Sequence, residues 1–411
     1  MRPERIGEIQ VMKTEIVQTE LLNRIGIDRI HLAMKISSIS LEQLKANGIE
    51  PSIGRKYTVL NTDNNEDITI DSLDYKKTTN TGGTDDTIYK LSICTHNHQY
   101  RLIVEAVLPR ILYKDITDTN LYNINTSKDT IYCFRQIRKE LNALGIVVED
   151  IVNWKARYFE VNKTVDFTPH NLNHYEYELQ WLMNSIRKYP AKTEVSLYSC
   201  GLEVERLADT YTISLSNKNK TVLYDKQLQM QNCMNIYVSN NLIRLEVKLN
   251  YKQIKDEFNT TNALSILTSK TKLNELYNAS VQSIADIINY QIEKDINYYC
   301  DLLENNKYGS LLEFYASNNT GSDRTIGLLD IIIIMEAVRL HYKKTGNSHY
   351  SRDINSLMTK IDNNHKHNYI SLISLLTAFS SKVSLYKFPK PVIKKYIENN
   401  EINITAMYGI K

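Results

Sequence analysis

A change in the spacing of the apolar residues is the feature that most constrains the fold of this chain. Up to about residue 250, short runs alternate between apolar and polar residues, which is typical of β-strands with one buried face. From about residue 256 onward, apolar residues recur at helical spacing. The change predicts an α+β protein, with an antiparallel sheet covered by helices on one face and a mostly helical C-terminal domain. We expect an N-terminal extension over 1–25, a sheet domain over 26–255 and a helical domain over 256–411.

Four of the alternating runs have a polar face opposite an apolar one. They cover residues 29–36, 158–167, 221–226 and 242–249. Because successive side chains of a strand point to opposite sides, the apolar faces would pack in a core and the polar faces would share the other side of the sheet. An antiparallel sheet can leave one side open, so we expect the polar side to be available to a ligand.

Carboxylates, one tyrosine and several cations fall on these polar faces. The carboxylates are Glu160 and Glu246, the tyrosine is Tyr224 with Lys226 two residues along, and the other cations are Arg29, Lys35, Arg244 and Lys248. Two carboxylates are enough for Mg²⁺ or Mn²⁺, which complete their shells with water or phosphate. A nearby cation also favours the phenolate of a tyrosine, whose usual pKa is about 10. These residues predict a metal-dependent nuclease with a tyrosine nucleophile, although a solvated sheet face without a catalytic role shows the same alternation.

Three short strings support the catalytic interpretation. Residues 224–226 are Tyr-Asp-Lys, residues 243–247 are Ile-Arg-Leu-Glu-Val, and residues 105–109 are Glu-Ala-Val-Leu-Pro. They resemble the replication initiators of the filamentous-phage gene II family, and also the related rolling-circle plasmid initiators and the relaxases of conjugative elements. The resemblance covers roughly residues 28–250. It implies a nicking domain with an HUH-like endonuclease core whose histidine motif is degenerate.

The resemblance also implies roles for individual residues. Tyr224 would be the nucleophile, with Lys226 as its partner, and Glu246 would be a metal ligand. Glu160 and Glu105 match further acidic positions of the family and would complete the metal site, although a structural role in a loop suits Glu105 equally well.

Two departures from the family pattern bear on this assignment. Residues 158–160 are Tyr-Phe-Glu where the family often has Arg-hydrophobe-Asp, so Glu160 matches less closely than Glu246. The histidine pair of the wider superfamily has a hydrophobic residue between the two histidines, whereas His96 and His98 flank an asparagine. These two histidines could be a metal pair or part of a solvated turn.

The C-terminal region is expected to contain several helices. Helical spacing predicts them over 263–276, 281–303, 309–315, 325–344 and 369–380. Residues 353–360 and 369–380 flank a short polar turn, as in a helix-turn-helix that binds duplex DNA. Packing against the sheet and self-association as a homodimer are equally compatible with this pattern.

Composition and cysteine spacing limit the location of the protein. The formal net charge of +3 is too small to indicate a nucleic-acid partner by itself. The five cysteines are scattered without a Cys-x-x-Cys pair, as is typical of free thiols in a reducing compartment. The longest apolar run, 331–335, is far too short to span a membrane. We therefore expect a cytoplasmic protein without a membrane partner.

The implied activity is the initiation of rolling-circle DNA replication. The protein would bind an origin hairpin, nick one strand at a single-stranded site through a 5′-phosphotyrosine, and later rejoin it, with helicase and polymerase supplied by the host. Two other classes stay open. One is a non-enzymatic protein that binds an origin or operator, and the other is a structural protein without DNA contact.

Overall fold

The computed structural model describes residues 13–14, 16–76, 88–113, 121–168, 193–198, 210–215, 220–234, 236–305, 328–361, 372–389 and 392. The chain divides into two compact units. The first comprises Met1–Asp166, Ser199–Glu205 and Asn217–Tyr277, and the second comprises Phe167–Tyr198, Arg206–Ser216 and Asn278–Lys411. Both units are therefore assembled from segments that are not contiguous in the sequence.

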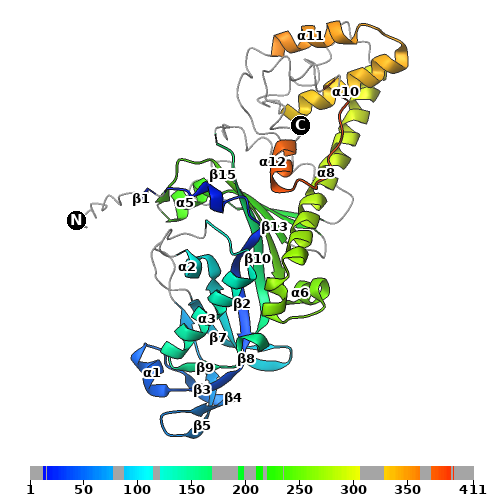
Figure 1. The fold of residues 1–411 in the computed structure, drawn as a ribbon. Coiled ribbons are helices and arrows are strands. Elements are labelled where there is room, and N and C mark those ends of the chain that lie inside the picture. Colours follow the sequence, from blue (N-terminus) through cyan, green and yellow to red (C-terminus); the bar gives the residue numbers. More distant parts are fainter. Residues whose placement is uncertain are drawn as a thin grey trace, which may run out of the picture. The chain divides into compact units, whose positions relative to one another are not determined.

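An antiparallel sheet forms the centre of the first unit (Figure 1). Its strand order is β13-β15-β10-β2-β8-β7-β6, and every neighbouring pair in this series is antiparallel. The strands are β13 (Lys220–Asp225), β15 (Leu242–Asn250), β10 (Lys155–Asp166), β2 (Gly26–Met34), β8 (Gln99–Val107), β7 (Ile88–His96) and β6 (Tyr75–Lys76). The predicted combination of an antiparallel sheet with helices is confirmed.

A smaller sheet extends the first unit. Its order is β5-β4-β3-β9, in which β3 and β4 are parallel and the other neighbours are antiparallel. The strands are β3 (Ile36–Ile39), β4 (Ser52–Asn61), β5 (Glu66–Ser72) and β9 (Ile146–Val148). The predicted strand over 29–36 is thus divided between the two sheets, because β2 ends at Met34 and β3 begins at Ile36.

Helices pack against the central sheet. The side chains of Ile30, Phe159 and Leu245 are fully buried on its apolar side. There α6 (Tyr251–Phe258) places Phe258 edge-on to Phe159, with 6.0 Å between the ring centroids. The other helices that belong wholly to this unit are α1 (Leu41–Ala46), α2 (Leu108–Leu112), α3 (Ser127–Ala143), α5 (Lys226–Met234) and α7 (Ala263–Thr268). Helix α3 ends just before Gly145, which has the positive φ of 89° that glycine tolerates.

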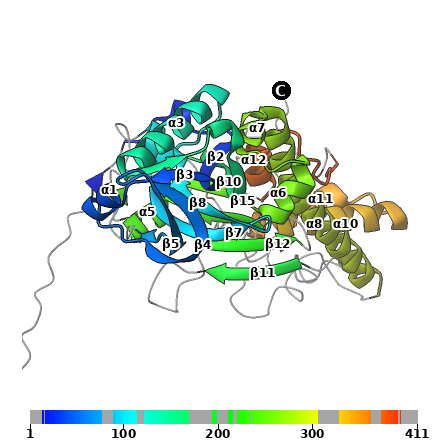
Figure 2. The same ribbon diagram turned by 90° about the horizontal axis from the view of Figure 1, so that it is seen from below.

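The second unit contains a hairpin and several helices. Strands β11 (Thr193–Tyr198) and β12 (Thr210–Leu215) are antiparallel and lie side by side in Figure 2. Its helices within the described ranges are α10 (Leu328–Thr345), α11 (Tyr350–Ile361) and α12 (Leu372–Phe379), together with most of α8 (Lys270–Asn305). Residues 362–371 lie outside the described residues; they contain most of the turn between the two expected helices of the helix-turn-helix and the first residues of the second helix. The predicted helix over 309–315 also falls outside them.

No helix within the described ranges is both long enough and apolar enough to cross a membrane.

Candidate metal and tyrosine site

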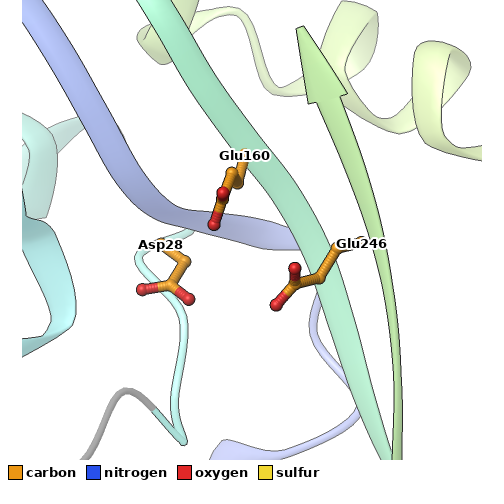
Figure 3. Close-up of side chains that lie close together, drawn as sticks. All are labelled: Asp28, Glu160 and Glu246. Carbon is orange, nitrogen blue, oxygen red and sulfur yellow. The ribbon is translucent and has the colours of Figure 1, made fainter. Parts of the chain in front are cut away.

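Three carboxylates from adjacent strands meet on the polar side of the central sheet (Figure 3). Asp28 of β2, Glu160 of β10 and Glu246 of β15 each place one oxygen atom within 4.8 Å of the others. All three side chains are buried. Oxygen ligands at this spacing suit a hard divalent cation such as Mg²⁺ or Mn²⁺. The group could therefore hold a metal ion, and it includes two of the three carboxylates that the sequence predicts for that role.

Asp28 reaches this side of the sheet because β2 contains a β-bulge. The register of β2 against β10 shifts between Phe159 and Val161. Two residues of β2, Asp28 and Arg29, therefore lie opposite Glu160 alone. Strict alternation would turn Asp28 toward the apolar side, so a period-two pattern in the sequence cannot identify it as a ligand.

Tyr224 contacts the carboxylate group directly. The Tyr224 hydroxyl donates a hydrogen bond to Oε1 of Glu246, with 2.6 Å between the oxygen atoms. Burial, together with the negative charge of Glu246, raises the pKa of Tyr224 well above its usual value of 10.0. The hydroxyl is therefore protonated in this environment, and Glu246 is placed to accept its proton.

Two cations hold Glu246 in its ionised form. Burial alone would raise the pKa of Glu246, but Lys248, Arg244 and the hydrogen bond from Tyr224 together lower it to about 2. The Lys248 ammonium lies 3.2 Å from Oε2 of Glu246 and 3.3 Å from Oε1 of Glu160, so it bridges the two carboxylates. Glu246 is thus ionised beside the tyrosine hydroxyl at neutral pH.

The other two carboxylates are in a less favourable electrostatic environment. Burial raises the pKa of Asp28 and also that of Glu160, and the charge of Glu246 raises both further. A divalent cation among the three groups would offset both effects, because it supplies positive charge where three buried carboxylates converge. The donor set therefore fits such a cation in both chemistry and charge.

Arg244 supports this group from the interior of the protein. Its guanidinium is fully buried and lies 3.2 Å from Oδ2 of Asp28. It also donates hydrogen bonds to Oγ1 of Thr164 at 2.8 Å and to the backbone oxygen of Leu121 at 2.7 Å. The sequence predicts a DNA contact for Arg244, but a guanidinium with these partners does not face solvent, and it positions Asp28 instead.

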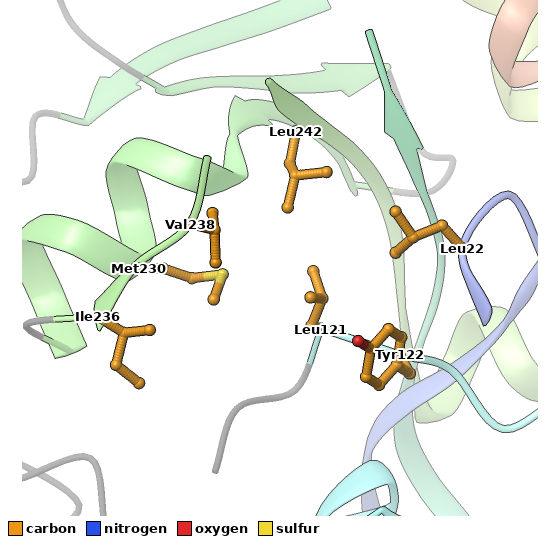
Figure 4. Packing of buried hydrophobic residues seen from close by; sticks show 7 residues of the cluster. All are labelled: Leu22, Leu121, Tyr122, Met230, Ile236, Val238 and Leu242. Atoms are coloured by element: carbon orange, nitrogen blue, oxygen red, sulfur yellow. The ribbon is translucent and has the colours of Figure 1, made fainter. Parts of the chain in front are cut away.

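The polar side of the sheet is covered near Tyr224, which corrects the expectation of an open surface. Leu242 follows the same alternation as Arg244 and Glu246 and packs into a small hydrophobic cluster (Figure 4). The cluster consists of Leu22, Leu121, Tyr122, Met230, Ile236, Val238 and Leu242. It joins α5 and the short strand β14 (Ile236–Tyr237) to residues from much earlier in the chain. Tyr224 itself is only 4% exposed.

Lys226 does not share a strand face with Tyr224, contrary to the sequence-based expectation. Strand β13 ends at Asp225, and Lys226 is the first residue of α5. The buried Lys226 ammonium donates a hydrogen bond to Oε1 of Gln229 at 2.8 Å. Its charge still contributes to the low pKa of Glu246. Lys226 therefore acts on the site electrostatically from the start of a helix.

Glu105 does not belong to the carboxylate group. Its side chain lies 2.9 Å from Nζ of Lys90 and 3.5 Å from Nε2 of His31. The His31 ring packs against Tyr158, with 4.6 Å between centroids, and the Tyr158 hydroxyl donates a hydrogen bond to Glu160. His31 and Tyr158 thus lie between Glu105 and Glu160.

The chain matches no known family and no curated protein. Among solved structures it is similar to a rolling circle replication initiator protein from Geobacillus stearothermophilus, with 11% sequence identity and a TM-score of 0.26. The match covers 63% of this chain and 83% of that chain.

The other residues that the sequence predicts for the site are two cations, Arg29 and Lys35, and two histidines, His96 and His98. Arg29 and Lys35 are exposed, and the charge of Arg29 partly offsets the rise in the pKa of Glu160. His96 is buried and packs edge-on to Tyr251, whereas His98 is exposed in the turn between β7 and β8. Within the described residues, neither histidine belongs to a group that could hold a metal ion.

Proposed function

We propose that this chain is a metal-dependent tyrosine DNA endonuclease that initiates rolling-circle replication. The observation that carries the proposal is the 2.6 Å hydrogen bond from Tyr224 to Glu246, inside a group of three carboxylates. A hydroxyl nucleophile, a carboxylate that can accept its proton and a set of oxygen ligands are the components that such a reaction requires. The resemblance of residues 105–109, 224–226 and 243–247 to gene II-type initiators supports the assignment to DNA.

The chemistry would be a transesterification, in which the phosphorus of one phosphodiester exchanges its bond to the 3′ sugar oxygen for a bond to the tyrosine oxygen. Tyr224 Oη would attack the phosphorus while its proton passes to Glu246. The bond to the 3′ oxygen breaks, and that oxygen takes up a proton and leaves as a free 3′-hydroxyl that can prime synthesis. The 5′ side of the strand stays on Tyr224 as a phosphotyrosine, and the reverse reaction rejoins the strand.

Asp28, Glu160 and Glu246 would hold the Mg²⁺ or Mn²⁺ ion, which supplies positive charge for the phosphate oxygens. Lys226 and Lys248 would add positive charge next to the same site. The exposed cations Arg29 and Lys35 would contact the DNA backbone, and such contacts position the strand without reading its sequence. Because Tyr224 is 4% exposed, the residues that cover it must move before DNA can reach the hydroxyl.

Formation of a covalent protein–DNA adduct tests this proposal. The full chain would be incubated with Mn²⁺ and a supercoiled plasmid that carries the gene for this chain and its flanking DNA. We expect open circles and an adduct that survives detergent, and we expect Tyr224→Phe to abolish both. Tyr132→Phe is the matched control, because Tyr132 is 45% exposed on α3 and lies outside the site. An adduct that persists in Tyr224→Phe would contradict the assignment of the nucleophile.

A non-enzymatic protein that binds an origin or operator is the second candidate. The burial of Tyr224 favours it, because a hydroxyl that only holds Glu246 in place would have the same environment. This candidate predicts retention of the same plasmid DNA in a filter assay, without cleavage and without dependence on Mn²⁺. Open circles with an adduct on Tyr224 would exclude it.

A further inference from the structure

Asn162 is a fully buried polar residue whose side-chain amide has no hydrogen-bond partner among the described residues. It is 0% exposed, and neither Oδ1 nor Nδ2 makes a hydrogen bond within the described part of the chain. An amide left in this state destabilises the folded protein, because it has given up its hydrogen bonds to water without replacing them. Buried polar side chains in proteins nearly always have a hydrogen-bond partner, so the state of this amide is unusual and indicates a ligand or another group at this position.

The position of Asn162 connects it with the carboxylate group. Asn162 follows Glu160 by two residues on β10, and side chains at this spacing lie on the same face of a strand. In the ladder with β15, Asn162 is directly opposite Glu246. The Cβ atoms of such a pair are about 4.5–5.5 Å apart. The amide therefore lies beside two of the three carboxylates and on their side of the sheet.

The other surroundings of Asn162 leave little room for bulk water. Its neighbour on β2 is Gly26, and a Cβ atom at Gly26 would lie 2.5 Å from the backbone oxygen of Ile124 and 2.7 Å from Cβ of Asn123. The segment at 123–124 therefore closes over this part of the sheet. Asn123 also donates a hydrogen bond from Nδ2 to the backbone oxygen of Asn162 at 3.0 Å. This hydrogen bond holds the strand in place, whereas no described residue pairs with the side-chain amide of Asn162.

We propose that Oδ1 of Asn162 is a neutral oxygen ligand of a divalent cation bound by Asp28, Glu160 and Glu246. This inference rests on the cation site of the proposed function and adds a residue to it. Amide oxygens are ordinary ligands of hard cations. A fourth ligand without charge would complete more of the shell without adding to the repulsion among three buried carboxylates. It would also give the Asn162 oxygen the partner that it lacks.

Mn²⁺ binding to the full chain tests the proposal without an activity assay. Free Mn²⁺ would be measured by electron paramagnetic resonance during titration of the wild type, Asn162→Leu and Asn162→Asp. We expect Asn162→Leu, which has a similar size and no oxygen, to weaken Mn²⁺ binding about tenfold or more, as does the loss of other groups that support a metal site. Asn162→Asp keeps an oxygen and should bind Mn²⁺ at least as tightly as the wild type.

Thr221→Val is the matched control. Thr221 is also fully buried, and its hydroxyl has no partner within the described residues, but it pairs with Val247 and so follows the apolar alternation of β15. Its replacement should leave the affinity for Mn²⁺ unchanged. Urea unfolding of each variant without metal would show that Asn162→Leu is folded. If it does not fold, Asn162→Asp decides the question, and weaker Mn²⁺ binding by that variant would overturn the proposal.

The outcomes separate this inference from the proposed function. If the wild type binds Mn²⁺ and Asn162→Leu binds it equally well, the role of Asn162 is refuted and the three-carboxylate site stands. If Glu246→Gln and Asn162→Leu both lose affinity, the inference is supported. If the wild type binds no Mn²⁺, both the inference and the metal dependence of the proposed function are wrong.

Discussion

Arg244 and Asp28 form an ion pair in the interior of the protein, with 3.2 Å between Nη1 and Oδ2 and side-chain exposures of 0% and 1%. The two residues are far apart in the sequence and come from β15 and β2, which are separated in the sheet by β10. The pair therefore ties the two outer strands of the site together across the central one.

Replacement of Arg244 by methionine should destabilise the protein strongly. Removing one partner of a buried ion pair leaves the other charge without compensation and typically costs about 3–5 kcal/mol. The free energy of unfolding in urea would be measured for Arg244→Met and for Arg138→Met. Arg138 pairs with Asp150 at the surface, with exposures of 39% and 54%, so its replacement should cost at most about 1 kcal/mol. Equal effects of the two substitutions would show that the buried pair has no special role.

Lys248 should weaken the binding of a divalent cation to the carboxylate group. Its ammonium bridges Glu160 and Glu246, so it places a positive charge close to the position that a divalent cation would take. The side chain is 26% exposed and its flexible stem can move toward solvent. Lys248→Met should therefore bind Mn²⁺ several-fold more tightly than the wild type, measured by titration. Lys252→Met, at an exposed position of α6, should bind Mn²⁺ as the wild type does. Weaker binding by Lys248→Met would mean that the ammonium supports the cation and does not compete with it.

Much of this site can be predicted from the sequence, because it depends on the alternation of side chains within single strands. Alternation along β10 and β15 suffices to place Glu160, Glu246 and Lys248 on one side of the sheet, and it assigns Tyr224 to a neighbouring strand. These positions depend only on the pleat of each strand. The predicted α+β class with an antiparallel sheet follows from the same pattern.

The features that the sequence does not predict depend on contacts between distant segments. The bulge at Asp28 is a property of the pairing between β2 and β10, so the sequence of β2 alone does not indicate it. Burial of the polar side arises because Leu22 and Leu121 pack against α5 and β14. The short run after Tyr224 also continues as a helix from Lys226, although the alternation of 221–226 is compatible with a longer strand.

The buried histidine His96 should make the stability of the protein depend on pH. Burial and the nearby cations Arg101, Arg157 and Lys155 lower the pKa of His96 from 6.5 to about 4. Below pH 6.5 the unfolded chain therefore binds a proton that the folded chain does not. The contribution to stability is fully present above pH 6.5 and is lost progressively as the pH falls toward 4.

Comparison with two variants isolates this effect. Between pH 7 and pH 5 the wild type should lose about 1–2 kcal/mol more stability than His96→Gln, measured by urea unfolding at each pH. His98→Asn is the control, because His98 is exposed in the adjacent turn and its positive φ of 61° is tolerated by asparagine. This variant should keep the pH dependence of the wild type. An identical pH dependence in His96→Gln and the wild type would show that His96 is protonated as readily in the folded chain as in the unfolded one.

Asp28 and Glu105 distinguish the site seen in the structure from the one that the sequence predicts. The sequence names Glu105 as a third metal ligand, whereas the structure places Asp28 beside Glu160 and Glu246 and leaves Glu105 with Lys90 and His31. Asp28→Asn should therefore weaken Mn²⁺ binding about tenfold or more, because it removes a charged ligand, while Glu105→Gln should change the affinity little. The same ranking is expected for adduct formation on the plasmid. If Glu105→Gln lost Mn²⁺ binding and Asp28→Asn kept it, the cation would have to lie on the His31 side of Glu160, and the bulge in β2 would have no part in binding it.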